Sequence, residues 1–262
     1  MIKTISSSSS SKEAHPLVTI VTVCFNAAAH IEQTIKSVLA QSYSQIEYVV
    51  IDGGSTDGTL EIIERFSNRI TKWISEPDDG IAHAMNKGLE MTRGDYVLFL
   101  HADDYLLSQT SIEEAVSYLQ GDHEIVAFTI YYETSKGKAL NRPRGFDWRM
   151  NFKTGLWHQA VFCQRCLFDR IGGFDPSFRI TMDYEFFLRA YRRGVSAKRI
   201  DLPISVMRDV GISSKKDWES LLLRFGEERR AQAKSNKNKP VIYSIYWPIY
   251  ITYRWFRYAM GI

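Results

Sequence analysis

The chain has 262 residues, 45% of them apolar, and a formal net charge of only +3. That length supports one large hydrophobic core, or a core with a small appendage, and the weak net charge gives no indication of a nucleic-acid partner. The cysteines, Cys24, Cys163 and Cys166, are odd in number and provide no disulfide framework, which is consistent with a reducing compartment.

The first fifteen residues contain serine at every position from 6 to 11 and few apolar side chains. A segment of this composition buries too little apolar surface to fold, so we predict a disordered leader over residues 1–15. It lacks the apolar centre of a secretory signal. A folded domain is therefore expected to begin at residue 16.

Apolar, β-branched runs then alternate with segments whose apolar residues recur at helical spacing. Parallel strands that alternate with helices bring their carboxyl ends to one edge of the sheet, where open α/β folds bind ligands. We therefore predict an α/β fold with a mostly parallel central sheet and helices on both faces. The predicted strands are Val18–Phe25, Glu47–Ile51, Lys72–Ser75, Tyr96–Leu100 and Ile125–Tyr131, and the predicted helices are Ile31–Ala40, Leu60–Phe66, Ile81–Met91 and Tyr184–Arg193, the last opened by Asp183 as its N-cap.

Polar clusters follow three of these strands. Asn26 follows the first, Asp52 begins D-G-G-S-T-D after the second, and H-A-D-D ends with Asp103 and Asp104 after D-Y-V-L-F-L. Two adjacent carboxylates repel each other unless a cation lies between them and a ligand, so Asp103 and Asp104 predict a divalent metal that could neutralise a diphosphate. The alternative is a solvated turn with a helix cap, which the position on the same edge as Asp52 disfavours.

Two other polar features on this edge can each be interpreted as structural or as functional. Asp52 could accept hydrogen bonds from a nucleobase N–H or a ribose hydroxyl, or it could belong to an ordinary turn in which Thr56 or Asp57 caps the next helix. A polar face at the start of the helix at 81–91 could contact nucleotide and phosphate, or it could be a solvated stripe. That face comprises Asp79, His83 and Asn86.

The pair Cys163 and Cys166, with His158 nearby, superficially suggests zinc or redox chemistry. A structural zinc site would need a second pair of ligands, and a redox pair would need a thioredoxin-like context, and neither is present in the sequence. We therefore interpret these residues as ordinary core cysteines.

Several motifs occur in order between Val18 and Ser213: T-V-C-F-N, V-I-D-G-G-S-T-D-G-T, S-E-P-D-D-G-I-A-H-A-M-N-K-G, G-D-Y-V-L-F-L-H-A-D-D, H-Q-A at 158–160, I-G-G-F-D at 171–175 and M-D-Y-E-F-F-L-R at 182–189. No single motif is decisive, but the ordered set is highly specific. It resembles the family 2 glycosyltransferases, whose nucleotide-sugar-binding fold is called GT-A. The resemblance implies a catalytic domain at 16–214, with a nucleotide-binding part at 16–104 and an acceptor part at 105–214.

The resemblance also implies a role for particular residues. Asp103 and Asp104 would be the aspartate motif that carries Mn²⁺ or Mg²⁺, and Asp183 would be the catalytic base, with Glu185 a less favoured alternative. The sequence has Met182 where many relatives carry Glu, and His101 where Asn is usual. Asp52 would contact the uracil or ribose, further contacts to the nucleotide sugar would come from Thr22, Phe25, Asn26, Asp79, Asn86 and Asp103, and His158 and Arg208 would orient the acceptor or the diphosphate.

This chemistry requires a base that takes the acceptor hydroxyl proton and a metal that stabilises the leaving diphosphate. A nucleotidyltransferase is a competing interpretation, but it usually has a glycine-rich, basic loop after the first strand, and Asn26-Ala27-Ala28-Ala29 is neither. A non-catalytic nucleotide-sugar-binding module is the other alternative, and it predicts no dependence on Asp183.

The basic residues are concentrated at the C-terminus. From Arg208 onward there are eleven Lys or Arg and five Asp or Glu, and Pro240–Ile262 interleaves aromatic residues with Arg254 and Arg257. Pro248 and the arginines argue against a spanning helix, so we expect a tail at 215–262 that either lies on an anionic membrane surface or packs on the domain. Taken with the family resemblance, which implies a UDP-sugar donor, this tail leads us to expect a cytoplasmic enzyme at the inner face of the cell membrane, with a lipid-linked saccharide acceptor, in the assembly of a bacterial surface polysaccharide.

Overall fold

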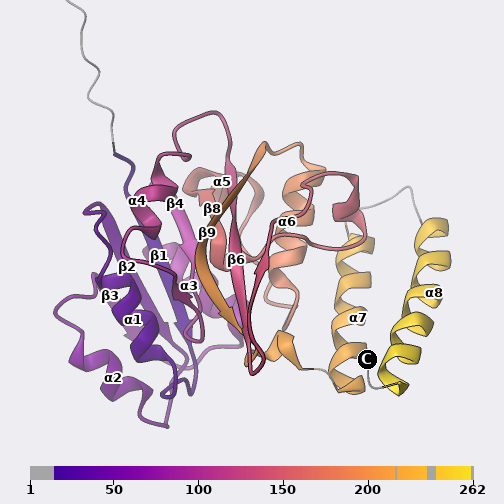
Figure 1. Ribbon diagram of the computed structural model, residues 1–262, viewed down its shortest axis with the longest axis horizontal. Helices are drawn as coiled ribbons and strands as arrows, with labels where there is room; N and C mark the ends of the chain where they lie inside the picture. The colour runs from indigo at the N-terminus through magenta and orange to yellow at the C-terminus, as the bar shows by residue number, and fades with distance from the viewer. Residues whose placement is uncertain (1–14, 216, 235–239, 261–262) are drawn as a thin grey trace, which may run out of the picture.

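The computed structural model describes residues 15–215, 217–234 and 240–260. The predicted leader lies almost entirely outside these residues. A twisted sheet with helices on both faces forms the body of the molecule, and two long helices stand beside it at the C-terminal side (Figure 1). The predicted α/β architecture is confirmed.

The first half of the sheet is parallel, as predicted. Its strands are β1 (Val18–Cys24), β2 (Ile46–Asp52), β3 (Lys72–Ser75) and β4 (Tyr96–Phe99), in the spatial order β3-β2-β1-β4. Helices α1 (Ile31–Leu39), α2 (Thr59–Arg65) and α3 (Ile81–Met91) connect them. Each predicted strand and helix up to Leu100 begins and ends within one residue of the observed element, because apolar periodicity is strong throughout this part.

The sheet continues beyond β4 as β8-β6-β9-β5. Strand β8 (Val161–Gln164) is antiparallel to both β4 and β6 (Ile125–Thr134), whereas β9 (Ala197–Arg208) is parallel to β6. The sequence predicts β6 but neither β8 nor β9. The remaining elements are β5 (Tyr105–Leu106), α4 (Ser111–Val116), β7 (Gly137–Asn141), η1 (Trp148–Asn151), η2 (His158–Ala160), α5 (Arg165–Ile171), α6 (Met182–Arg192) and η3 (Ile212–Ser214).

Each face of the sheet carries its own apolar core because side chains alternate along the strands. In β1, Val21 and Val23 pack with α3, α5 and α6 on one face, and Val18 and Ile20 pack with α1, α2 and α4 on the other. Cys163 is buried in the first of these cores, as predicted, but Cys166 is exposed, so the prediction of a core position is wrong for Cys166. Burial raises the pKa of the Cys163 thiol well above its ordinary value.

Helix α6 begins at Met182, two residues earlier than an Asp183 N-cap requires, so that prediction is wrong. Thr181 occupies the N-cap position, and Asp183 is the second residue of the helix. The backbone N–H groups of Arg179, Ile180 and Thr181 instead donate to the buried carboxylate of Glu227 at 2.7, 2.9 and 2.9 Å. One side chain of the C-terminal region therefore holds the segment that leads into Asp183.

Glu227 belongs to α7 (Trp218–Lys234), which packs on α6, and α8 (Pro240–Ala259) packs on α7 through Phe225, Trp247 and Tyr250. The indole N–H of Trp247 donates to Gln232 Oε1 at 2.7 Å. Among the described helices, none has both the length and the apolar character needed to cross a membrane.

We expect Glu227→Gln to lower the free energy of unfolding by about 3 kcal/mol. A glutamine presents only one acceptor oxygen, and its amide hydrogens would face the N–H groups of residues 179–181. Chemical denaturation measures the loss. The control is Glu219→Gln, an exposed carboxylate in the first turn of the same helix. Equal stability of the two variants would contradict the anchoring role of Glu227.

Candidate active site

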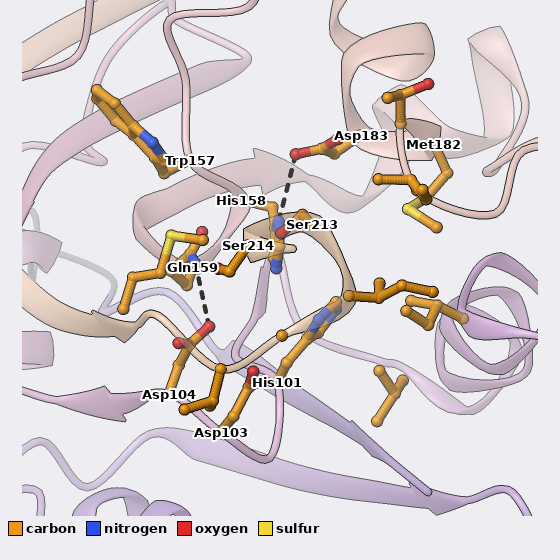
Figure 2. Close-up of a pocket in the computed structure, with 18 of the residues that line it drawn as sticks. His101, Asp103, Asp104, Trp157, His158, Gln159, Met182, Asp183, Ser213 and Ser214 are labelled. Atoms are coloured by element: carbon orange, nitrogen blue, oxygen red, sulfur yellow. Dashed lines mark hydrogen bonds and ion pairs between the residues drawn. The ribbon is translucent and has the colours of Figure 1, made fainter. Parts of the chain in front are cut away.

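A cavity of about 970 Å³ lies at the carboxyl ends of β1 and β4. Residues that follow β1, such as Phe25, line it on one side, and Tyr250 of α8 lines it on another. Its centre brings together the loop after β4, η2, the first turn of α6 and η3 (Figure 2). The volume is at the top of the range of roughly 300–1,000 Å³ that is usual for ligand sites, and therefore suits a large substrate or two substrates.

The loop after β4 places its two aspartates differently. Asp104 is 3% exposed, and its carboxylate accepts from Gln159 Nε2 at 3.0 Å and from the Arg208 backbone N–H at 3.1 Å. Burial, followed by the nearby charge of Asp103, raises the pKa of Asp104 well above its ordinary value. Asp103 is partly exposed to the cavity, and a Cβ on Gly211 would lie only 3.0 Å from its Oδ2. The absence of a side chain at position 211 thus leaves room over this carboxylate.

Three neighbouring side chains, His101, His158 and Asp183, extend across the cavity to the start of α6. The His101 and His158 rings lie 4.2 Å apart between centroids, and His158 Nδ1 lies 3.3 Å from Asp183 Oδ2 (Figure 2). Burial and the neighbouring His158 lower the pKa of His101 well below its ordinary value. The Nε2 atoms of both histidines are buried and have no protein partner. Buried polar atoms are normally paired, so these two nitrogens indicate that a ligand belongs in the cavity.

Six of the predicted site residues line this one cavity. They come from the end of β1, the loop after β4, η2 and α6, which are far apart in the sequence. Phe25 lines it although the side chain is 63% exposed, so its ring face is accessible to a planar group. The six are Phe25, Asn26, Asp103, Asp104, His158 and Asp183.

Asp52 does not line the cavity, so the structure does not show the direct nucleotide contact expected of it. The residue is fully buried, and its Oδ2 accepts from Gly54 N, Ser55 N and Ser75 Oγ at 3.2, 3.0 and 2.7 Å. Burial by itself raises the pKa of Asp52, but the hydrogen bonds from Ser55 and Ser75 outweigh it and lower the pKa. Asp52 therefore organises the loop after β2. The spacing of the motif could not reveal that these loop groups already occupy the carboxylate.

Three other residues expected at the nucleotide lie elsewhere. Thr22 is fully buried and accepts from the Tyr48 hydroxyl at 3.2 Å, because it belongs to the side of β1 that faces α1. The side chain of Asp79 is 93% exposed, and its neighbour Asp78 lines the cavity instead. Asn86 bonds the backbone of Phe174 through both ends of its amide, at 2.7 and 2.8 Å. None of these three side chains lines the cavity.

Arg208 also lies outside the cavity lining. Its guanidinium donates to the backbone oxygen of Asp103 at 2.7 Å and stacks 4.6 Å from the centre of the Tyr105 ring. Its backbone N–H bonds Asp104, so Arg208 supports the aspartate loop from behind and is not placed for the expected phosphate contact. The register of β9 next to β5 sets this position, and β9 is not predicted by the sequence.

The sequence analysis assigns no role at the site to several other lining residues. Asp78 packs over Gly53, where a Cβ would lie 2.6 Å from its Oδ2. Gln159 stands in the H-Q-A motif, and its Oε1 is buried without a partner. Lys153, Arg224 and Arg254 also line the cavity, and none of them belongs to one of the ordered motifs.

The site fits a divalent cation that is shared with a phosphate ligand. Among residues 15–215, 217–234 and 240–260, no three His, Cys, Asp or Glu side chains could enclose a metal by themselves. Mg²⁺ sites are commonly built from one or two carboxylates completed by substrate phosphates and water. Asp103 provides such a carboxylate at a cavity whose polar atoms His101 Nε2 and Gln159 Oε1 have no partner. The donor set therefore suits a hard cation that arrives with an anionic substrate.

Comparison with known proteins identifies relatives of this chain. The family model described as glycosyl transferase family 2 matches residues 19–198. A PGL/p-HBAD biosynthesis glycosyltransferase of Mycobacterium tuberculosis is 31% identical over 188 residues, which cover 68% of this chain and 71% of the relative. An uncharacterised glycosyltransferase of the same organism is 36% identical over 181 residues, with coverages of 67% and 69%.

Solved structures show the same fold at lower identity. Staphylococcus aureus TarS 1–349 in complex with UDP-GlcNAc superposes with a TM-score of 0.61 at 18% identity, over 73% of this chain and 58% of that chain. The mannosyltransferase PcManGT from Pyrobaculum calidifontis, in complex with GDP-Man and Mn²⁺, gives a TM-score of 0.63 at 22% identity, over 83% and 65%. This chain therefore spans less than two thirds of either solved chain.

Proposed function

The chain belongs to glycosyl transferase family 2 and is a glycosyltransferase of the GT-A fold, and we propose that it transfers a sugar, with inversion, from a UDP-sugar to a lipid-linked saccharide. The observation that carries this proposal is the convergence of Asp103 and Asp183 on one cavity, with His158 between them. The family membership does not favour a nucleotidyltransferase or a non-catalytic binding module.

The donor belongs at the end of the cavity next to β1 and β4. The accessible ring of Phe25 offers a stacking face for a nucleobase, and Asp103 would hold Mn²⁺ or Mg²⁺ beside the diphosphate, with Asp104 behind it. When bound, such a cation neutralises charge on the departing diphosphate. TarS binds UDP-GlcNAc and PcManGT binds GDP-Man, so UDP is the proposed nucleotide and the alternative is GDP.

The acceptor reacts next to Asp183. As the acceptor oxygen forms its bond to the anomeric carbon, the bond from that carbon to the diphosphate oxygen breaks, and the hydroxyl proton passes to the Asp183 carboxylate. Asp183 Oδ1 accepts from the Tyr184 N–H at 2.7 Å and Oδ2 faces His158, so the carboxylate is held in one orientation. A base in this position supports inversion, because it activates an oxygen that attacks opposite the leaving group.

The outer face of α8 supports an acceptor that is embedded in a membrane. Ile245 and Ile249 are 60% and 66% exposed, and Phe256 is 55% exposed. Since these residues recur at helical spacing, they form one apolar stripe, and the side chains of the opposite face pack on α7. The helix therefore packs on the domain and also presents the surface needed for peripheral binding to the inner face of the cell membrane. The stripe consists of Ile242, Ile245, Ile249, Tyr253, Phe256 and Met260.

We expect Ile245→Ser combined with Ile249→Ser to weaken binding to vesicles that contain phosphatidylglycerol by about tenfold or more, since each buried apolar side chain contributes about 1.5–3 kcal/mol. Vesicle co-sedimentation measures the binding. Leu140→Ser, an exposed apolar residue on β7, is the control and is expected to bind like the unmodified protein. Undiminished binding of the double variant would remove the support for a membrane role of α8.

The proposed reaction is tested by UDP release. The protein is incubated with Mn²⁺, a panel of UDP-sugars and GDP-mannose, with and without lipid-linked saccharides from bacterial membranes. We expect sustained UDP release from one donor only when acceptor is present. Release of GDP alone would contradict the proposed donor, and equal release without acceptor would contradict transfer to a lipid-linked saccharide.

A further inference from the structure

The cavity has a second charged region on the side that α7 and α8 form. Among the described residues that line it, the lysine and arginine side chains are Lys153, Arg224 and Arg254, and all of them lie at this side. Four of the five lining Asp and Glu residues lie elsewhere, and Glu228 alone accompanies the three cations. Lys153 pairs with Glu228 at 2.5 Å, so the arginines keep a local excess of positive charge.

The three cations form one cluster. Lys153 Nζ, Arg224 Cζ and Arg254 Cζ lie 5.7, 5.9 and 5.8 Å from the centre of the same Phe225 ring. Three positive side chains grouped around one ring give this side of the cavity a positive potential, which favours binding of an anion.

Two buried polar atoms beside the cluster have no protein partner. They are Arg224 Nε and Ser214 Oγ, although Arg224 also donates from Nη1 to the Ser213 backbone oxygen at 3.0 Å. Buried donors without partners indicate a missing acceptor, and arginine is the residue best suited to phosphate. Arg224 and Arg254 come from α7 and α8, whereas Asp103, which we assigned to the metal beside the donor diphosphate, comes from the loop after β4.

We propose that Lys153, Arg224 and Arg254 form a subsite for a phosphate group of the acceptor. The inference rests on the proposed transfer to a lipid-linked saccharide and specifies its chemistry: the acceptor carries its saccharide on a lipid phosphate or diphosphate. Tyr250 lines the same region, and the apolar stripe of α8 lies on the outer side of that helix. A lipid phosphate held here would place its chain near the membrane face while its saccharide reaches toward Asp183.

The variants Arg254→Gln and Arg257→Gln provide a matched test. Both remove one positive charge from α8, but Arg254 lines the cavity and Arg257 does not. Calorimetric titration uses octyl phosphate as the probe and octyl glucoside as its neutral counterpart, both below micellar concentrations. The protein is first saturated with UDP and Mg²⁺, so that the donor site is filled.

We expect octyl phosphate to bind the UDP-saturated protein, Arg254→Gln to weaken that binding by about tenfold, and Arg257→Gln to leave it within about twofold. Unchanged UDP affinity in Arg254→Gln shows that the variant is folded and the donor site intact. Absence of octyl phosphate binding to the UDP-saturated protein, or equal loss in the two variants, would overturn the subsite.

A vesicle measurement separates an acceptor phosphate from a lipid headgroup. We expect Arg254→Gln to bind phosphatidylglycerol vesicles like the unmodified protein, because its side chain faces the cavity. Loss of vesicle binding in this variant would assign Arg254 to the membrane surface and overturn the subsite. Failure of the UDP-release assay with intact octyl phosphate binding would instead count against the proposed reaction and leave the anion site in place.

Discussion

Asp183→Asn is expected to reduce the rate of sugar transfer by about 10³-fold, because removal of a general base costs on the order of 10²–10⁴ in rate. Asparagine has nearly the same shape and can still bond the Tyr184 N–H, but it cannot take the acceptor proton. The side chain of Asp183 is 20% exposed and lies beside His158, so a substrate can reach it and its orientation is fixed. The donor-binding residues near β1 are unaffected by this change.

The measurement is steady-state UDP release with acceptor present. We expect kcat to fall while KM for the UDP-sugar stays within about twofold, which identifies a group that acts in the transition state. Asp169→Asn is the matched control, since Asp169 is an exposed carboxylate on α5 that bonds Arg165 and does not line the cavity. Retention of more than about a tenth of the activity in Asp183→Asn would move the role of base to another group.

Asp103→Asn is expected to reduce transfer by about 10²-fold or more, since loss of one electrostatic stabiliser of a developing anion costs on the order of 10²–10³. Its distinguishing readout is binding. In the unmodified protein, UDP should bind more tightly with Mn²⁺ than with EDTA, because a cation held by Asp103 would neutralise charge on the diphosphate. In Asp103→Asn this difference should largely disappear, whereas Asp169→Asn should retain it. A Mn²⁺ effect of full size in Asp103→Asn would show that Asp103 does not hold the metal.

The elements from β1 to β4 could be predicted closely because the sequence of each one is sufficient to specify it. Strands β1 and β2 are rich in apolar, β-branched residues, and α1 and α3 have apolar residues at helical spacing, so each element is determined by its own sequence. Strand β8 has only four residues, and β9 contains charged residues and Pro203, so neither has a clear period. These strands are stabilised by pairing with neighbouring strands, and the local sequence does not show which strands will pair.

The site was predicted in part for the same reason. Asp103, Asp104 and Asp183 follow from strand ends and ordered motifs, and the structure brings them to one cavity. Asp52 and Arg208 were expected to contact substrate, but each is engaged with a residue distant in the sequence: Asp52 accepts from Ser75, and Arg208 donates to the backbone oxygen of Asp103. Arg224 and Arg254 join the cavity only because α7 and α8 pack against the domain. No motif in the tail encodes that packing.

The most direct test of the account is a crystal structure of the protein with UDP and Mn²⁺, in which the metal is located by its anomalous scattering. The account predicts Mn²⁺ coordinated by Asp103 and by the diphosphate within the cavity lined by His158 and Asp183, with Asp183 facing the position of the sugar. Mn²⁺ bound away from Asp103, or a diphosphate outside that cavity, would contradict it.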